Sequence, residues 1–192
     1  MNCRYCKTFL QHIFLDLGRA PPSNAYLNKN DLNKPETYYP LKVYVCDQCW
    51  LVQTKDYANA KALFNSDYAY FSSTSSGWLA HAKSYTEKMT KELNLNNGSY
   101  VIEIASNDGY LLKNFVAADI PCLGIEPTAS TAEASQKIGI PVLSKFFDKD
   151  LAKQLAAEGK QADLVIGNNV YAHVPDINNF TKGLKEILKT GG

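Results

Sequence analysis

The pattern of hydrophobic and polar positions changes near residue 100. From Tyr100 onward, short apolar runs alternate with segments in which apolar residues recur at helical spacing. Short apolar runs separated by helices predict a parallel sheet that is buried on both faces. The predicted strands cover 100–105, 121–127, 140–144 and 163–169, and the predicted helices cover 109–119, 129–139, 148–158 and 177–189.

The chain before residue 100 has a different character. Residues 40–45 alternate, with Leu41, Val43 and Val45 on one face, and predict a strand that runs into Cys46. Further along, Ser75 or Ser76 is a suitable cap for a helix that the sequence 94–99 ends. Its apolar residues recur at helical spacing and comprise Trp78, Leu79, Ala82, Tyr85, Met89 and Leu93. We therefore predict a small domain over 1–56, a connecting segment with a helix over 57–95, and the α/β domain over 96–192.

Two C-x-x-C pairs lie in the small domain. Cys3 and Cys6 form the first pair, and Cys46 and Cys49 form the second. Two such pairs can supply four thiolates to one tetrahedral zinc ion. The long insertion between them is tolerable, because the entropy of loop closure grows only logarithmically with length. Four protein ligands leave no open position, so the predicted zinc is structural and supplies folding energy to a loop-rich segment.

Other interpretations of the cysteines remain open. Each pair alone would also suit a redox dithiol or ordinary buried thiols. Cys122 lies within an apolar strand and is interpreted as a core residue. His12 is surplus to a complete set of four ligands and is interpreted as a surface or packing residue.

Composition and charge exclude several classes of protein. Of the 192 residues, 45% are hydrophobic and 20% are charged, as in ordinary globular proteins. The formal net charge of +1 does not favour nucleic acid, which argues against a zinc ribbon that binds DNA or RNA. No apolar run reaches the roughly 18 residues of a membrane span, and no apolar signal segment follows Met1. We therefore expect a cytoplasmic protein with reduced cysteines, no membrane and no nucleic-acid partner.

The segment Glu103–Gly109 joins the first predicted strand to a helix. A strand that ends at a glycine turn before a helix presents free backbone N–H groups and the positive end of the helix dipole at one place. The small residues Ala105, Ser106 and Gly109 would let a ligand approach the main chain. Glu126 ends the next strand, where an acid can accept hydrogen bonds from both hydroxyls of a ribose. The pattern predicts an adenosine cofactor, although an ordinary strand-turn-helix corner would begin in the same way.

The kind of cofactor follows from the glycine count and the charge. The loop has one glycine and lacks the two others that would hold a pyrophosphate, so a dinucleotide fits less well. Glu103 and Asp108 could offset the positive charge of a sulfonium ion. S-adenosylmethionine is therefore the better candidate.

These motifs together resemble the S-adenosylmethionine-dependent sugar C-methyltransferases, which carry an N-terminal zinc-binding domain before a Rossmann-like class I methyltransferase core. The resemblance covers nearly the whole chain. Ala105 departs from it, because the family usually has glycine there. The segments that carry the resemblance are CRYC, FLDLGRAPPSNAYL, YPLKVYVCDQCWLVQ, YAYFSSTSSGWLAH, IEIASNDGYLL, GIEPT, KFFD and NNVYAHVPD.

The resemblance implies roles for particular residues. The loop from Glu103 to Gly109, which includes Asn107 and Asp108, would hold the methionine moiety. Glu126 would bind the ribose, and Pro127 after it belongs to the cofactor-binding set. Phe146 and Phe147 would form an apolar wall against adenine, or would be core residues. Asn168 and Asn169 would face the methionine part, or would cap the following turn.

The family's chemistry requires a base and a group that stabilises an enolate. A 4-keto sugar has an acidic C–H at carbon 3, and the enolate formed there attacks the methyl group. The catalytic candidates are His173, which follows the fourth strand, and Tyr70, in a motif that the family places over the cofactor. His81 lies on a helix and is interpreted as structural or exposed.

The predicted function is C-methylation of a nucleotide-linked 4-keto deoxysugar. An O- or N-methyltransferase and a non-catalytic fragment that binds zinc and cofactor are the alternatives. The sequence ends at LKTGG, which in this fold precedes the fifth strand, so we expect an incomplete sheet. We accordingly expect this chain to bind zinc and cofactor more readily than it turns over substrate. The sugar and the oligomeric state are not predicted.

Overall fold

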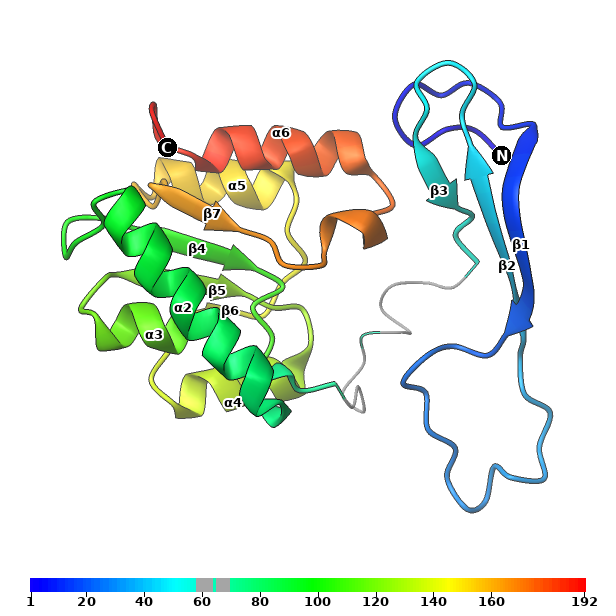
Figure 1. Cartoon of the computed structure of the whole chain (residues 1–192), viewed down its shortest axis with the longest axis horizontal. Helices are drawn as coiled ribbons and strands as arrows, with labels where there is room; N and C mark the ends of the chain where they lie inside the picture. Colours follow the sequence, from blue (N-terminus) through cyan, green and yellow to red (C-terminus); the bar gives the residue numbers. More distant parts are fainter. Residues whose placement is uncertain (58–63, 65–69) are drawn as a thin grey trace. The chain divides into compact units, whose positions relative to one another are not determined.

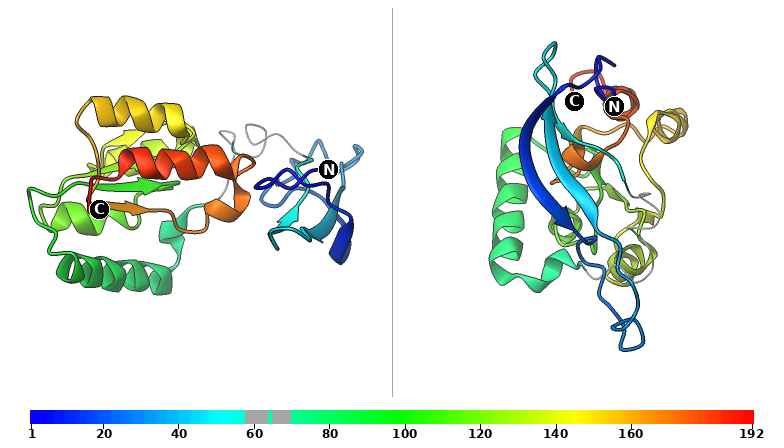
Figure 2. Two further views of the ribbon diagram at one scale, coloured as in Figure 1. Left: turned by 90° about the horizontal axis from the view of Figure 1, so that it is seen from above. Right: turned by 90° about the vertical axis from the view of Figure 1, so that its right-hand side faces the viewer.

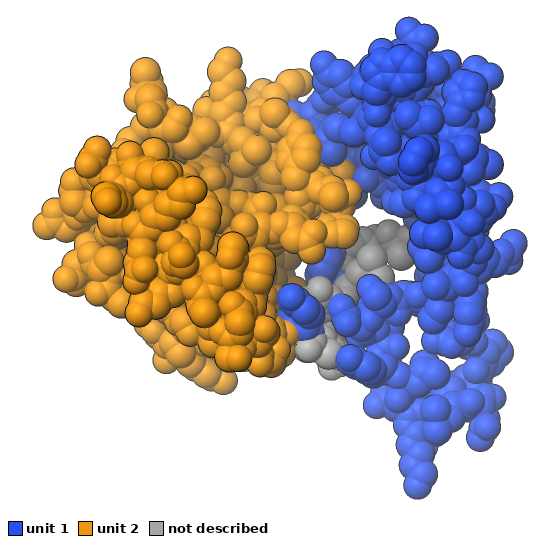
Figure 3. All heavy atoms as spheres, in the orientation of Figure 1, with its two compact units in different colours: residues 1–70, 175–178 blue, residues 71–174, 179–192 orange. Residues whose placement is uncertain are grey.

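The computed structural model describes residues 1–57, 64 and 70–192 of the chain. It divides into two compact units, which Figure 3 shows in different colours. The first comprises residues 1–70 and 175–178, and the second comprises 71–174 and 179–192. The helix that we assigned to a connecting segment therefore belongs to the second unit.

The first unit contains an antiparallel sheet in the order β1-β2-β3. Its strands are β1 (His12–Ala20), β2 (Tyr39–Val45) and β3 (Val52–Thr54). The sequence predicts β2 correctly but not the other two. Almost every residue of β1 is exposed, so it lacks the alternation of buried and exposed positions that reveals a strand. The buried core is small and consists of Cys3, Leu10 and Cys46.

The second unit contains a four-stranded parallel sheet in the order β6-β5-β4-β7. Its strands are β4 (Val101–Ile104), β5 (Cys122–Ile125), β6 (Val142–Leu143) and β7 (Leu164–Ile166). All four predicted strands are present, and each is shorter than predicted. The strand order reverses beside β4, because β5 and β6 lie on one side of it and β7 lies on the other. Ligands of open α/β sheets bind at the carboxyl ends of the strands at such a point.

Helices cover both faces of this sheet (Figures 1 and 2). On one face lie α2 (Ser76–Glu92), α3 (Leu112–Ala117) and α4 (Ala129–Lys137). On the other face lie α5 (Lys149–Ala157) and α6 (Ile177–Ile187). Two short 3-10 helices, η1 (Ser72–Thr74) and η2 (Tyr171–His173), complete the unit. This arrangement confirms the predicted α/β class.

Side-chain caps explain where two of the helices begin. The Ser75 hydroxyl accepts a hydrogen bond from the Trp78 N–H at 3.3 Å, and the Asp148 carboxylate accepts one from the Leu151 N–H at 2.8 Å. Helix α3 is shorter than the predicted segment 109–119, because the backbone continues as a turn through Leu111 before it becomes helical.

Successive residues of β4 point into different cores. Val101 packs with Leu112, Phe115 and other residues under α2 and α3. Ile102 and Ile104 pack with residues of α5 and α6. Since side chains alternate along a strand, Glu103 points to the same face as Val101. An acid therefore lies within an apolar layer.

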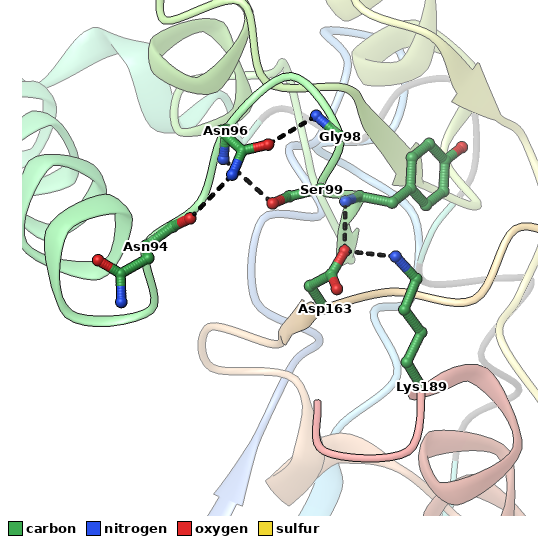
Figure 4. A network of polar contacts seen from close by, with 7 residues as sticks. Asn94, Asn96, Gly98, Ser99, Asp163 and Lys189 are labelled. Carbon is green, nitrogen blue, oxygen red and sulfur yellow. Dashed lines mark hydrogen bonds and ion pairs between the residues drawn. The ribbon is translucent and has the colours of Figure 1, made fainter.

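A polar network fixes the amino ends of β4 and β7 (Figure 4). Asp163, just before β7, accepts hydrogen bonds from the Tyr100 N–H at 2.6 Å and the Lys189 ammonium at 2.7 Å. The Asn96 side-chain oxygen, Oδ1, accepts one from the Gly98 N–H at 2.8 Å and shapes the turn before β4. Burial raises the pKa of Asp163, but its bonds to Lys189 and Tyr100 outweigh burial and lower the pKa overall. Within the described residues, we find no helix with the length and apolar character that a membrane span requires.

Candidate cofactor site and metal centre

The four predicted zinc ligands come together in the first unit. The sulfur atoms of Cys3, Cys6, Cys46 and Cys49 all lie within 4.8 Å of one another. The Sγ atoms of Cys3 and Cys49 are 3.6 Å apart, and those of Cys6 and Cys46 are 3.5 Å apart. A tetrahedral zinc ion with Zn–S bonds of about 2.3 Å holds its sulfur atoms about 3.8 Å apart. The donor set therefore fits zinc with no large rearrangement.

The two C-x-x-C segments have matching backbone turns. The Lys7 N–H donates to the Cys3 carbonyl at 3.1 Å, and the Trp50 N–H donates to the Cys46 carbonyl at 2.9 Å. Lys7 and Trp50, each directly after the second cysteine of its pair, both have positive φ angles, of 67° and 61°. The two turns thus repeat one conformation that aims both thiols of a pair in the same direction.

The thiols differ in how readily they ionise. Burial raises the pKa of Cys3, but hydrogen bonds from Gln53 and from backbone N–H groups outweigh it and lower the pKa to about 6. A backbone hydrogen bond from Leu51 lowers the pKa of Cys49, yet burial and the neighbouring sulfur atoms raise it to about 12 overall. A divalent cation is what would allow all four to be thiolates together.

Cys122 and His12 lie outside the metal centre, as the sequence predicts. Cys122 is buried in the core beneath α2 and α3. The His12 ring lies 3.7 Å from the Asp47 carboxylate and is outside the sulfur cluster. Neither residue is needed for the metal.

The second candidate site lies at the carboxyl ends of β4 and β5. The strands are adjacent and in register, with Ile104 opposite Ile125. Beyond the ladder, the Ala105 N–H donates to the Ile125 carbonyl at 2.8 Å, so the two chains are still paired where the loop begins. The carboxyl ends of β4 and β5 therefore lie side by side, as the sequence predicts.

Glu126 connects these two strand ends. One of its carboxylate oxygens accepts a hydrogen bond from the Asn107 N–H at 2.9 Å, and the other accepts one from the Thr128 N–H at 2.9 Å. The side chain is only 4% exposed. Each carboxylate oxygen can accept a second bond, so the group can still take ribose hydroxyls while it positions the loop.

The loop after β4 has an unusual backbone. Ala105, Asn107 and Gly109 have φ angles of 57°, 51° and 80°, in the left-handed region. The N–H groups of the loop hold this conformation: those of Ala105 and Ser106 donate to the Ile125 carbonyl at 2.8 and 3.4 Å, and that of Gly109 donates to the Ser106 carbonyl at 3.1 Å. Alanine at position 105 adopts this conformation at a cost that the glycine usual in the family avoids.

Gly109 is required for packing, in addition to the ligand approach that we predicted. A Cβ atom there would lie 2.3 Å from Ile140 Cδ1 and 2.6 Å from Ser135 Oγ, so the space is filled by protein. Likewise, a Cβ atom on Gly124 would lie 2.4 Å from Ser106 Oγ. Both glycines let the loop pack against β5, α4 and the segment before β6, and Ser106 is itself fully buried.

The segment before α2 is attached to this loop. The Ser72 N–H donates to Asn107 Oδ1 at 2.9 Å, and the Ser73 N–H donates to Asp108 Oδ2 at 3.0 Å. The sequence did not predict these bonds, because they join residues that are 35 positions apart. They give Asn107 and Asp108 a structural role in holding η1 against the loop.

Glu103 is the most unusual group of the site. The residue is fully buried, and neither carboxylate oxygen has a hydrogen-bond partner among the described residues. Burial raises its pKa well above the usual value, and the carboxylates of Glu126 and Asp108 add to the rise, while Tyr110 and Asn168 oppose it in part. The site thus places, next to the loop, a carboxyl group whose ionised form burial disfavours.

The residues that we expected around the adenine and methionine parts of the cofactor lie in different environments. Phe146 is exposed, whereas Phe147 packs edge-on against Phe180 of α6 with ring centroids 5.1 Å apart. Phe147 is thus a core residue of the α6 face. Asn168 donates to the Tyr110 hydroxyl at 3.1 Å, and the exposed Asn169 has a φ of 51°. Pro127 is half-buried in the turn after Glu126.

The catalytic candidates remain predictions. His173 is exposed in η2, beyond the carboxyl end of β7. Tyr70 is 52% exposed and belongs to the first unit. His81 is exposed on α2 and stacks on Trp78 with ring centroids 5.2 Å apart, which suits the structural interpretation.

Tyr110 and Trp78 are further candidate site residues that sequence reasoning missed. Tyr110 is 4% exposed, and its ring stacks on Trp78 with centroids 5.8 Å apart. Burial, followed by the nearby Glu103 carboxylate, raises the pKa of the Tyr110 hydroxyl. The position of Tyr110 directly after Gly109 was the available signal, since the first residue after such a turn lies beside the strand end.

A hollow in the second unit lies away from these groups. It has a volume of about 480 Å³ and is near the amino ends of β4 and β5, at the edge opposite the loop. Its lining consists of Tyr100, Val116, Asp119, Ile120, Pro121, Cys122, Gly139 and Pro141. Because ligands of such sheets bind at the carboxyl ends of the strands, this hollow is a poor candidate for the cofactor.

Two protein families match the chain. Residues 3–64 match a family described as "Putative zinc binding domain", and residues 102–192 match a family described as "Methyltransferase domain". The first match contains the four-cysteine cluster, and the second contains the loop after β4. The domain order predicted from the sequence is therefore correct, and the predicted zinc and methyl-donor cofactors agree with the two families.

Similar individual proteins include the C-methyltransferase NovU of Streptomyces niveus. It is 27% identical over 191 residues, which is 100% of this chain and 45% of NovU. The chain thus spans less than half the length of this relative.

Similar solved structures include the magnesium protoporphyrin IX methyltransferase of Synechocystis with bound S-adenosylmethionine (17% identity, TM-score 0.47, 59% of this chain and 55% of that chain). The sugar N-methyltransferase KedS8 of a Streptoalloteichus species is another (18% identity, TM-score 0.45, 59% of this chain and 46% of that chain).

Proposed function

We propose that this chain transfers a methyl group from S-adenosylmethionine to a carbon atom, since residues 3–64 match a zinc-binding domain family and residues 102–192 match a methyltransferase domain family. We propose a nucleotide-linked 4-keto deoxysugar as the acceptor. The observation that carries the proposal is the junction of β4 and β5, where Glu126 accepts hydrogen bonds from Asn107 and Thr128 at the carboxyl edge of the sheet.

The residues at this junction suit an adenosine cofactor. Glu126 would bind the ribose hydroxyls with its remaining lone pairs, and the left-handed loop Ala105–Gly109 would face the methionine part. Glu103 and Asp108 supply buried carboxyl groups and so favour a cation over a phosphate. S-adenosylmethionine supplies the electrophilic methyl group when it is bound.

The protein's own task is to prepare the acceptor carbon. A base must remove the proton from the carbon next to the ketone, and a hydrogen-bond donor must stabilise the enolate oxygen that results. His173, which is exposed beyond the carboxyl end of β7, is the candidate base. Tyr70 is the candidate donor to the enolate oxygen or to the substrate phosphate.

The support for the carbon acceptor is the similarity to NovU over the whole length of this chain. A radiolabelled methyl-transfer assay with a nucleotide-linked 4-keto deoxysugar tests the proposal, and the product is analysed by NMR. A new carbon–carbon bond supports it. Label on oxygen or nitrogen would replace it with one of the alternative acceptors.

Calorimetric titration separates binding from turnover. Binding of S-adenosylmethionine without methyl transfer would support the cofactor site and leave the chain as a cofactor-binding part of a larger enzyme. A chain that binds neither S-adenosylmethionine nor S-adenosylhomocysteine would refute the proposed function.

A further inference from the structure

Glu103 is a buried ionisable group that the proposed mechanism leaves without a proton-transfer role. It lies in β4, an interior strand of the sheet, opposite Gly124 on one side and Ile166 on the other. Its side chain points into the apolar layer that contains Val101, Cys122 and Ile166. An ionised carboxylate without hydrogen bonds in such a layer is strongly disfavoured.

The groups that face Glu103 relieve this cost only in part, because Tyr110 and Asn168 lower its pKa by less than burial raises it. Asp108 follows it in the loop, and Glu126 lies at the end of β5; both are acids. Tyr85 on α2, Cys122 on β5 and Tyr110 after the loop are neutral when protonated, and the nearby Glu103 contributes to the raised pKa of each. Asn168, which follows β7, is also neutral. No cation is among the described groups that influence Glu103.

A positively charged ligand would change this balance. An opposite charge within about 4–6 Å favours the ionised form of a carboxyl group. The loop that follows Glu103 is where the proposed donor, which carries a sulfonium and an ammonium, would bind. We propose that Glu103 is a neutral acid in the free protein and that binding of the cationic donor drives its proton into solvent.

This inference rests on the proposed function, because it requires the donor to bind beside β4. In the proposed step, the O–H bond of Glu103 breaks, its electron pair stays on the carboxylate, and the proton goes to the buffer. The bound state thus gains a negative charge next to the positive ligand. Affinity for the donor should therefore rise with pH, by up to tenfold per pH unit while the free protein holds the proton.

Calorimetric titration of S-adenosylmethionine in buffers of different ionisation enthalpy counts the protons released. The measurement is made between about pH 6 and pH 9, where buried glutamates can titrate. We expect wild type to release up to one proton more than Glu103→Gln, which keeps the shape of the side chain but cannot ionise. The difference between wild type and Glu103→Gln cancels the protons that the ligand's own amino group releases on binding.

The matched control is Glu133→Gln, which changes an exposed acid on α4. It should release as many protons as wild type. Proton release that is equal in wild type and Glu103→Gln, with binding intact in both, would overturn the inference and leave the proposed function standing. Absence of binding heat with any ligand would instead refute the proposed function.

Two further readouts do not depend on the variant binding its ligand. Infrared difference spectra of wild type should lose a protonated-carboxyl band when S-adenosylmethionine is added, and an unchanged band would contradict the inference.

The pH dependence of the stability of the free protein gives the second readout. Since burial raises the pKa of Glu103 in the folded state, the unfolded chain loses this proton first, and stability falls as pH rises above about 4.3. Glu103→Gln should remove that part of the fall, and identical pH profiles of stability would also contradict the inference.

Discussion

Replacement of Gly109 by alanine tests the packing that holds the loop after β4. Two costs are expected. The φ angle of +80° places a non-glycine residue in the left-handed region, at about 1–2 kcal/mol. The added methyl group would lie 2.3 Å from Ile140 Cδ1 and 2.6 Å from Ser135 Oγ, and such overpacking costs about 1–3 kcal/mol. We therefore expect the second unit to lose about 2–5 kcal/mol of stability.

Gly139 provides a matched control. Its φ angle is +84°, but an added Cβ atom would meet nothing within 4 Å. Gly139→Ala should therefore show the backbone cost alone, and the difference between the two variants, about 1–3 kcal/mol, is the packing cost.

Urea unfolding measures both variants. The chain has two tryptophans, and Trp50 is 74% exposed in the first unit, so a Trp50→Phe background leaves Trp78 to report on the second unit. At unchanged m-value, a stability loss appears as a lower midpoint. Equal midpoints for Gly109→Ala and Gly139→Ala would refute the claim that Ile140 and Ser135 fill the space beside the loop.

Three other changes test separate parts of the structure. Cys46→Ser should abolish binding of a stoichiometric zinc ion, measured by mass spectrometry of the metal, whereas Cys122→Ser should keep it, and full zinc retention by Cys46→Ser would contradict the four-thiolate site. Ala105→Gly should stabilise the second unit by up to about 1 kcal/mol in urea unfolding, since it relieves a φ angle of 57°, and a loss of stability would contradict this. Asp163→Asn should cost about 1 kcal/mol at neutral pH. The pKa of Asp163 is lowered in the folded protein, so the carboxylate stabilises the fold above its unfolded pKa of about 3.9, and this stabilisation is lost as pH falls through the folded pKa. A difference in stability between Asp163→Asn and wild type that persists at pH 2 would refute the role given to the Asp163 carboxylate.

The parallel sheet could be predicted because its signal is local. Buried strands such as Val101–Ile104 are continuous apolar runs between turn residues, and Ser75 marks the start of α2. The cysteine cluster was predictable for a similar reason, since two C-x-x-C pairs specify the ligands without any knowledge of the intervening chain.

What the sequence did not predict depends on contacts between distant segments. The bonds from Ser72 and Ser73 to the loop and the ring of Phe147 against α6 join residues far apart in the chain. The glycine at 109 was predicted, but its reason lies in Ser135 and Ile140, which no local pattern identifies. Strand β1 was missed because an edge strand with both faces exposed has no buried side to give it a period.

The most direct test of the account is a crystal structure of the protein with S-adenosylhomocysteine. We expect the ribose hydroxyls within hydrogen-bonding distance, about 2.5–3.2 Å, of the Glu126 carboxylate, beside the loop Ala105–Gly109. A nucleoside bound elsewhere, for example in the hollow between Tyr100 and Pro141, would contradict the central claim that the ends of β4 and β5 form the cofactor site.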